Sequence, residues 1–294
     1  MDEQIRITLS DDARVFNRHA AGFLEASLER NVLATVAAQL LGEARPQAPS
    51  DARYAVGVDA RSGEVVAAAL RTPPRHLISA GFLRPAAAAE LIRSWLAHDP
   101  QLSGVSAAPA EALELCRAFS RITGGRTERQ FSEALYVLDE VRRPAAMPPG
   151  SLRVAREQEL DLISRWLGAF SAETGFGDPG MAAHNAARFL ADGRMHVWDA
   201  GEPVTLVGNA VSVAGVSRVG PVYTPPEHRR RGYAGAAVAV RSQQLLDQGA
   251  ARCMLFADLA NATANRIYTA VGYSRAGAWE EHRFLADLDP SPPG

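Results

Sequence analysis

The sequence predicts an α/β (α+β) fold that is organised as two units in tandem. Strand-like and helix-like patterns alternate through residues 151–288, and a similar order recurs in the first half. The segment Arg142–Ser151 contains three prolines, which helix interiors and central strands exclude. We therefore expect an N-terminal domain at 1–141, a linker at 142–150, a second domain at 151–288 and a disordered tail at 289–294.

The second domain has the clearer pattern of elements. Leu160, Ile163 and Leu167 recur at the spacing of one helix face, and Arg252–Ala257 is a short apolar run that suits a buried strand. The predicted order is β-α-α-β-β-β-α-β-α-β. The strands are predicted at Leu152–Arg156, Arg194–Asp199, Val204–Val213, Val216–Tyr223, Arg252–Ala257 and Arg275–Phe284. The helices are predicted at Glu157–Phe170, Met181–Ala191, Arg231–Gln248 and Ala262–Val271, with a loop at Ser171–Gly180.

The first half has a vaguer pattern, whose strand and helix order echoes the later part of the second domain. Because no residue motif repeats, we predict a degenerate internal duplication. Helical composition is found at Thr8–Ala21, Phe23–Leu41, Ala86–His98 and Pro109–Phe119. Strands are predicted at Tyr54–Val58, Val65–Leu70, Leu77–Ala80, Leu102–Ala107 and Phe131–Leu138.

The charge balance limits the classes of partner. Lys and Arg total 31 and Asp and Glu total 33, so the chain lacks the basic excess that nucleic acids and membrane surfaces attract. Cys116 and Cys253 have no CxxC spacing, which argues against a disulfide framework or a zinc site. The chain has no apolar leader or membrane span, so we expect a cytoplasmic protein, as a monomer or a homodimer.

The stretch Val222–Gly235 (VYTPPEHRRRGYAG) has the composition of an anion-binding turn. It leads into a predicted helix, whose first N–H groups are unpaired and whose N-terminus carries a partial positive charge. Gly232, Ala234 and Gly235 lack bulk, so a diphosphate could approach these amides, and Arg229–Arg231 add formal charge. The alternative is a solvated basic turn before an ordinary helix.

Two motifs in the second domain resemble those of the GCN5-related N-acetyltransferases. Arg229–Ala234 (RRRGYA) matches the pattern Gln/Arg-x-x-Gly-x-Gly/Ala, whose loop holds the coenzyme A pyrophosphate in that family. Asn261–Tyr273 (NATANRIYTAVGY) resembles the family's second motif. The resemblance covers Leu152–Asp287 and, more weakly, the first half. It implies a mixed, mostly antiparallel central sheet flanked by helices, in two tandem units of which the first is degenerate.

The resemblance also implies how the chain would hold acetyl-CoA as a co-substrate. Backbone groups of Val222 and Thr224 would pair with the pantetheine arm, and the amides of residues 230–235 would hold the pyrophosphate. Tyr268 would donate a proton to the departing thiolate. Asn261, two helical turns away, is also a good helix N-cap. The expected coenzyme-binding residues are Val222, Tyr223, Thr224, Arg229, Arg230, Arg231, Gly232, Tyr233, Ala234, Gly235, Asn261 and Tyr268.

The sequence departs from the family in its general base. Many members carry a Glu on the central strand, whereas Pro203–Pro226 contains no Asp or Glu. We expect Glu173 in the Ser171–Gly180 loop to take this role, with Glu280 and Glu281 as alternatives; a carboxylate of this kind is more often a solvated surface charge.

These observations predict direct acetyl transfer from acetyl-CoA to the amine of a small molecule or a peptide. The enzyme would position two substrates and stabilise the tetrahedral oxyanion, and no metal would be required. Two alternatives remain. One is a non-catalytic acyl-CoA-binding regulatory module, and the other is a tandem transferase of this fold that uses a different acyl donor.

Overall fold

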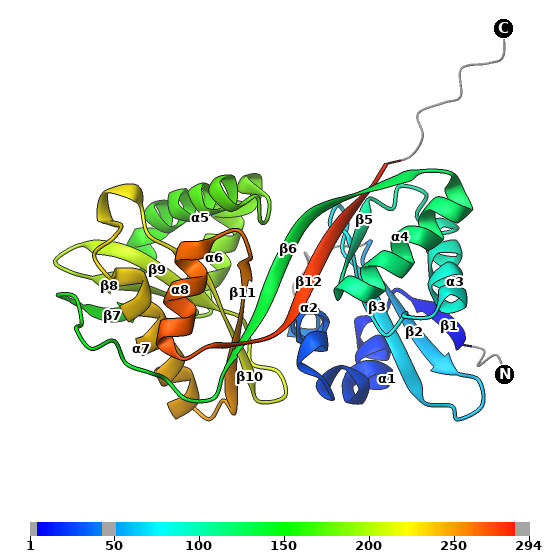
Figure 1. Cartoon of the computed structure of the whole chain (residues 1–294), viewed down its shortest axis with the longest axis horizontal. Helices are drawn as coiled ribbons and strands as arrows, with labels where there is room; N and C mark the ends of the chain where they lie inside the picture. Colours follow the sequence, from blue (N-terminus) through cyan, green and yellow to red (C-terminus); the bar gives the residue numbers. More distant parts are fainter. Residues whose placement is uncertain (1–4, 43–50, 286–294) are drawn as a thin grey trace, which may run out of the picture. The chain divides into compact units, whose positions relative to one another are not determined.

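The computed structural model describes residues 5–42 and 51–285, which form two compact units of mixed α/β structure (Figure 1). Unit 1 comprises Met1–Ala134 and Gly277–Gly294, and unit 2 comprises Leu135–Ala276. None of the helices within the described ranges is long and apolar enough to cross a membrane.

Unit 1 is built from the first half of the sequence and the end of the last strand. Its strands are β1 (Ile5–Ser10), β2 (Arg53–Asp59), β3 (Val65–Arg71), β4 (Leu77–Ala80), β5 (Gly104–Ala107) and the first part of β6 (Arg126–Leu138). Its helices are α1 (Ala13–Glu25), α2 (Asn31–Gly42), α3 (Pro85–Leu96) and α4 (Pro109–Thr123), with a 3₁₀ turn η1 (Leu28–Arg30).

Unit 2 is built from the second half and the end of β6. Its strands are β7 (Ser151–Val154), β8 (Met195–Asp199), β9 (Pro203–Asn209), β10 (Val216–Tyr223), β11 (Arg252–Asp258) and the first part of β12 (Ser274–Leu285). Its helices are α5 (Leu160–Thr174), α6 (Ala182–Ala191), α7 (Tyr233–Asp247) and α8 (Ala262–Val271). Three 3₁₀ turns are η2 (Glu157–Glu159), η3 (Pro179–Met181) and η4 (Pro226–His228).

The two halves of the sequence have the same order of elements. Each runs strand, two helices, three strands, helix, strand, helix and a long last strand. This confirms the predicted order β-α-α-β-β-β-α-β-α-β, and at the level of topology it confirms the predicted tandem repeat. Because the repeat is a repeat of element order, residue motifs need not recur.

The first element of unit 1 corrects the sequence prediction. The sequence predicts a helix over Thr8–Ala21, whereas Ile5–Ser10 form β1, antiparallel to β2. Apolar side chains at alternate positions of this strand pack on the core of unit 1. The helix starts only after Asp12, whose Oδ1 accepts from the N–H groups of Arg14 (2.7 Å) and Val15 (3.2 Å).

The sheet of unit 2 is mixed and mostly antiparallel, with the strand order β6-β11-β10-β9-β8-β7. β7, β8, β9 and β10 pair antiparallel in turn, and β10 pairs parallel with β11. α5 and α6 cover one face through a core that includes Ile163, Leu167, Met195 and Leu206. α7 packs against β9 and β10, where the alternate side chains of these strands point the other way.

The long last strands exchange between the two units. Glu280–Arg283 of β12 pair antiparallel with Gly104–Ala107 of β5 in unit 1. The end of β6, from residue 135 onward, belongs to unit 2, where β6 neighbours β11. The unit boundaries therefore differ from the predicted domain ends at 141 and 288, because each unit is completed by a strand from the other half. The segment 142–150 has no helix or strand, and the tail predicted at 289–294 lies outside the described residues.

Candidate active site

The turn between β10 and α7 presents the backbone amides that the sequence predicts. Arg230 (φ 65°) and Gly232 (φ 83°) adopt the left-handed conformation, and α7 then begins at Tyr233 without a side-chain cap. The first N–H groups of a helix have no intrahelical partner, so the start of α7 offers donors and a partial positive charge. Arg229, Arg230, Arg231 and Gly232 are exposed, which leaves these groups accessible.

The small residues at this helix start have distinct roles. A Cβ built on Gly232 would meet no atom within 4 Å, so glycine is favoured there by the positive φ rather than by lack of space. Tyr233 is buried, so it can contribute only its amide to the turn. A Cβ built on Gly235 would lie 3.7 Å from Ile267, which shows that the first turn of α7 touches α8 beside Tyr268.

β10 separates from its parallel neighbour β11 several residues before it reaches this turn. Within the part of the chain that the structure describes, Val216–Arg218 of β10 pair with Arg252–Met254 of β11, and β10 continues beyond this pairing to Tyr223. Within the described residues, the pairing of β10 on its other side continues to Leu206 of β9, after a bulge between Val219 and Val222. The edge of β10 that faces β11 is therefore open to an added extended chain.

Glu173 lies in the last turn of α5, because the helix continues to Thr174 through the first part of the predicted loop. Both of its carboxylate oxygens accept from Nη2 of Arg229, at 2.8 and 2.6 Å. The hydroxyl of Tyr223 donates to the same carboxylate at 3.1 Å, and Nε of Arg229 donates to the Thr224 carbonyl at 2.8 Å. The fold thus brings Glu173 into one polar cluster with three predicted site residues about 50 positions later in the sequence, Tyr223, Thr224 and Arg229.

The environment of Tyr223 keeps its hydroxyl protonated. Burial raises the pKa of Tyr223 most, and the hydrogen bond to the Glu173 carboxylate raises it further. The nearby Arg229 charge acts in the opposite direction. Its guanidinium lies 5.7 Å from the centre of the Tyr223 ring. At neutral pH the phenol is therefore a hydrogen-bond donor toward Glu173.

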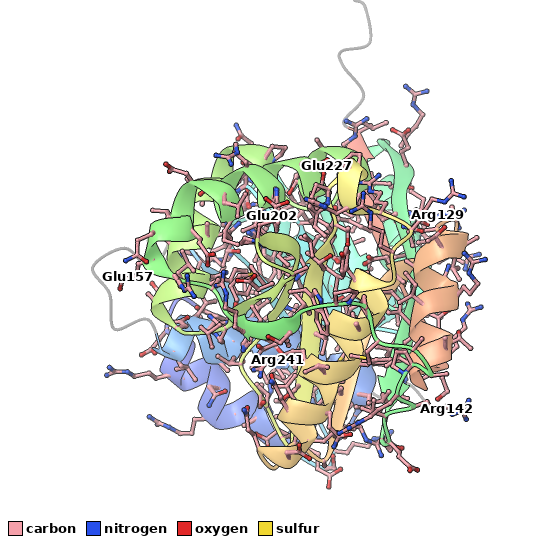
Figure 2. All side chains as sticks on the ribbon, turned by 90° about the vertical axis from the view of Figure 1, so that its left-hand side faces the viewer. Arg129, Arg142, Glu157, Glu202, Glu227 and Arg241 are labelled. Carbon is pink, nitrogen blue, oxygen red and sulfur yellow. The ribbon has the colours of Figure 1, made fainter. Side chains whose placement is uncertain are left out.

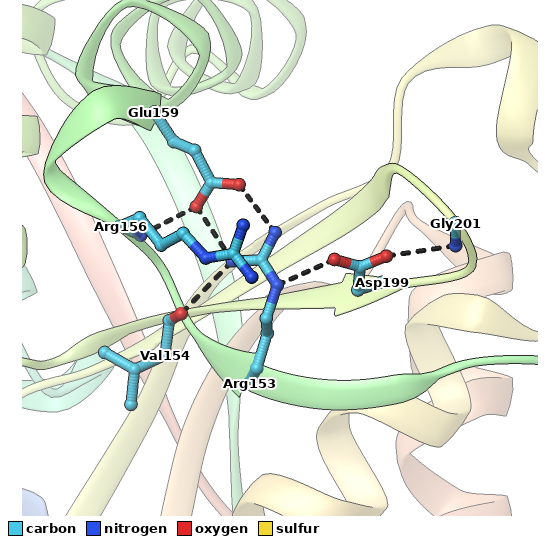
Figure 3. A network of polar contacts seen from close by, with 6 residues as sticks. All are labelled: Arg153, Val154, Arg156, Glu159, Asp199 and Gly201. Carbon is cyan, nitrogen blue, oxygen red and sulfur yellow. Dashed lines mark hydrogen bonds and ion pairs between the residues drawn. The ribbon is translucent and has the colours of Figure 1, made fainter.

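A polar network fixes the start of α5, the helix that carries Glu173 in its last turn (Figure 3). Arg153 of β7 donates from Nη2 to Glu159 at 2.6 Å and from Nε to Asp199 of β8 at 2.7 Å. The second Glu159 oxygen accepts from the backbone N–H of Arg156 at 2.7 Å. Hydrogen bonding to Arg153 is the main cause that lowers the pKa of both carboxylates, so they stay ionised.

The second motif forms α8. Asn261 caps this helix by accepting from the Ala264 N–H at 3.0 Å, which is the alternative that the sequence offered for it. Tyr268 is half-buried, with its ring centre 6.3 Å from that of Tyr136 and 6.2 Å from that of Tyr273.

Asn265, within the same motif, was missed by the sequence reasoning. It accepts from the Tyr136 hydroxyl at 3.1 Å and donates to the carbonyls of Asp258 and Leu259. Its place one helical turn before Tyr268 is the signal that could have identified it. Asn265 therefore ties α8 to the end of β11 and to β6.

The two alternative carboxylates belong to unit 1. Glu281 is 3.6 Å from Nε2 of His76, and Glu280 contacts Arg129 at 3.1 Å and His282 at 2.9 Å. Burial raises the pKa of Glu281, and the His76 charge opposes this shift. Both side chains are engaged with partners of unit 1, so Glu173 is the predicted base that the structure places beside the turn of unit 2.

The corresponding turn of unit 1, between β4 and α3, already holds a carboxylate of the chain. Glu111 accepts from the Ser79 hydroxyl at 2.6 Å and from the N–H groups of Gly81 (2.9 Å) and Phe82 (3.1 Å). Its side chain is buried, which raises its pKa. α3 also begins with Pro85, which lacks an N–H. This turn therefore differs from the exposed, uncapped start of α7.

No group of three or more His, Cys, Asp or Glu side chains could hold a metal ion among the residues that the structure describes. Cys116 and Cys253 are buried free thiols, and burial raises the pKa of each to about 11.

Comparison with known proteins gives the class of this fold. Residues 199–284 match the family model of FR47-like protein, which is related to the GCN5-related N-acetyltransferases (GNATs). No curated protein matches the sequence.

Solved structures match over nearly the whole chain. A GNAT-family acetyltransferase from Colwellia psychrerythraea aligns with 96% of this chain and 100% of its own, at a TM-score of 0.58 and 11% identity. A GCN5-related N-acetyltransferase from Sphaerobacter thermophilus aligns with 94% of this chain and 95% of its own, at a TM-score of 0.56 and 16% identity. A tandem GNAT protein from the clavulanic acid biosynthesis pathway aligns with 97% of this chain and 100% of its own, at a TM-score of 0.54 and 14% identity.

At these identities the structural likeness defines the fold, which is a tandem α/β fold of the GNAT type. The FR47-like match covers residues 199–284, most of which lie in unit 2.

Proposed function

We propose that unit 2 is an acetyl-CoA-dependent N-acetyltransferase that acts on the amine of a small molecule or a peptide. Two observations carry this proposal: the uncapped start of α7 after left-handed Arg230 and Gly232, and the last part of β10, which continues to Tyr223 beyond its pairing with β11. The start of α7 suits a diphosphate, and the edge of β10 suits the amide-bearing pantetheine arm. The diphosphate and the pantetheine arm are both parts of coenzyme A.

The residues present fit such a co-substrate. The backbone amides of residues 230–235 would hold the pyrophosphate, with the charges of Arg230 and Arg231 beside it. The open edge of β10 around Val222 and Thr224 would pair with the pantetheine amides. The thioester supplies the activated acetyl group. Every other contribution to the reaction comes from the chain, which positions the acceptor and stabilises charge.

Two proton transfers complete the proposed reaction. The acceptor nitrogen attacks the acetyl carbon, the C–S bond breaks, and the nitrogen loses a proton. Glu173 is the carboxylate beside β10 that can take this proton, directly or through the Tyr223 hydroxyl. Tyr268, whose helix touches the first turn of α7, would give a proton to the thiolate.

The test is coenzyme A binding by the Gly232→Glu variant, measured by calorimetry. The new side chain places a negative charge in front of the amides, so we expect affinity to fall by more than about tenfold. The matched control is Gly249→Glu at the other end of α7. Gly249 also has a positive φ (99°) and open space around it, so the control carries the same strain and charge. Equal affinity of both variants and the wild type would contradict the proposal that this turn holds the diphosphate of coenzyme A.

The same titration gives the number of sites. We expect one coenzyme A per chain, because Glu111 occupies the turn of unit 1. The non-catalytic alternative is favoured by the absence of Asp and Glu from Pro203–Pro226. Coenzyme A binding without thiol release on a broad panel of amines would select that alternative. Release only with a different acyl donor would select a transferase of other donor specificity.

A further inference from the structure

Arg229 connects the turn before α7 with the last turn of α5. Its backbone opens the run of amides in which Arg230 and Gly232 are left-handed. Its side chain reaches Glu173 through Nη2, at 2.8 and 2.6 Å, and the Thr224 carbonyl through Nε, at 2.8 Å. One residue thus belongs to the proposed diphosphate site and to the neighbourhood of the proposed base.

The Arg229–Glu173 pair is open to exchange. The two side chains are 42% and 44% exposed, and an ion pair at such exposure contributes little to stability because water screens it. The side-chain hydrogen bonds of Arg229 to described residues come from Nε and Nη2, which leaves Nη1 for a further acceptor. A phosphate oxygen near the turn would offer this guanidinium a charge-assisted partner that competes with the carboxylate.

We propose that Arg229 is shared between Glu173 and the diphosphate of acyl-CoA, and that coenzyme binding loosens the Arg229–Glu173 pair. This inference rests on the proposed function of unit 2. Without coenzyme, Arg229 holds the carboxylate of Glu173. With coenzyme, the carboxylate and the Tyr223 hydroxyl that donates to it are released toward the acceptor. Arg229 is therefore a positioning residue that makes the proton acceptor available only when the acyl donor is present.

The proposal has a thermodynamic consequence that needs no acceptor substrate. If the coenzyme weakens the pair, the pair must weaken coenzyme binding by the same factor. Removing the charge of Glu173 frees Arg229 and should therefore tighten coenzyme A binding. A residue that merely supported the turn would give the opposite sign, because its loss would misplace Arg229.

The experiment measures coenzyme A affinity by calorimetry for the full chain and four variants: Glu173→Gln, Glu227→Gln, Arg229→Ala and the double variant of Arg229→Ala with Glu173→Gln. Glu173→Gln should bind about three- to tenfold more tightly than the wild type. The control is Glu227→Gln, which removes the same charge from an exposed position within the turn itself (Figure 2). We expect it to change affinity by less than about twofold. In an Arg229→Ala background, Glu173→Gln should have no effect, because the shared residue is gone.

Each contrary outcome has a separate meaning. Equal tightening by Glu173→Gln and Glu227→Gln would reduce the effect to general charge and overturn the sharing of Arg229. Weaker binding by Glu173→Gln would also overturn it, and would make Glu173 a support of the turn. A persisting effect in the Arg229→Ala background would assign the coupling to another residue. Absence of coenzyme A binding by the wild type would instead contradict the proposed function itself.

Discussion

Arg241 of α7 donates two hydrogen bonds to the side-chain oxygen of Asn209 in β9, from Nε at 3.2 Å and from Nη2 at 3.0 Å. Both residues are buried, and the Arg241 Nη1 group donates to Gln244 at 3.1 Å. Burial lowers the pKa of Arg241, because removal from water disfavours its charged form. The guanidinium of Arg241 thus hydrogen-bonds to an amide oxygen of the sheet, that of Asn209, and not to a carboxylate.

Replacing Asn209 by Leu should destabilise the protein strongly. The change leaves two N–H groups of a buried guanidinium without an acceptor, which costs about 3 kcal/mol of unfolding free energy. Urea unfolding followed by circular dichroism measures this loss. The double variant Asn209→Leu with Arg241→Met removes donors and acceptor together and should recover most of the stability. A single variant that loses less than about 1 kcal/mol would contradict this account.

Separating the two halves of the chain at the linker should prevent both from folding. Residues 1–141 would lack Trp279 and Phe284 of β12, which are buried in unit 1. There the Phe284 ring stacks on Phe119 at 3.9 Å, and the Trp279 indole donates to Ser106 at 2.8 Å. The other half would lose the end of β6 and expose a sheet edge.

The measurement for this prediction is thermal unfolding of each half, alone and after co-expression, with the intact chain as control. We expect a cooperative transition only for the co-expressed halves and the intact chain. A cooperative transition of residues 1–141 alone would show that β12 is dispensable for unit 1.

The element order of unit 2 could be predicted from the sequence because its signals are local. Asn261 caps α8 and Gly272 ends it in the left-handed conformation, so the predicted and observed bounds of this helix agree. The exposed turn before α7 was also recognisable, since its conformation depends on neighbouring residues; its binding of an anion stays a prediction.

The strand exchange and the polar cluster could not be predicted in this way. The apolar pattern of β12 fits any sheet with a free edge, so the pattern alone does not select its partner β5. The contact between Glu173 and Arg229 joins residues 56 positions apart, and it depends on how α5 packs on the sheet. β1 was missed because six residues directly before a helix give too short an alternating pattern.

His196 should make the protein acid-sensitive. This buried residue of β8 has no hydrogen-bond partner for Nδ1 among the described residues. Burial, and to a lesser degree the charge of Arg241, lower its pKa from 6.5 to about 4. In the unfolded chain His196 therefore binds a proton below about pH 6.5, whereas in the folded protein it stays neutral until the pH approaches about 4. Stability is fully present above that pH and falls as pH drops towards about 4.

Between about pH 7.5 and 5 this residue should contribute a loss of about 2 kcal/mol, which urea unfolding at the two pH values measures. His196→Leu should make the pH dependence shallower by that amount. His184→Leu, which removes an exposed histidine of α6, is the control and should leave the dependence unchanged. Parallel pH profiles of the wild type and His196→Leu would show that His196 is protonated as readily in the folded state.

Tyr268→Phe tests the proposed general acid, with an acceptor first identified by screening amines for thiol release. Loss of the phenol should lower kcat by about 10²- to 10⁴-fold, the usual range for a proton-transfer group, while coenzyme A affinity stays nearly unchanged. Tyr136→Phe is the control, because it removes a neighbouring hydroxyl that bonds Asn265 and has no proposed part in the chemistry. A thiol has a pKa of about 8.5, so water could protonate the thiolate instead. Wild-type kcat for Tyr268→Phe across about pH 6 to 9 would leave the tyrosine with a packing role between Tyr136 and Tyr273.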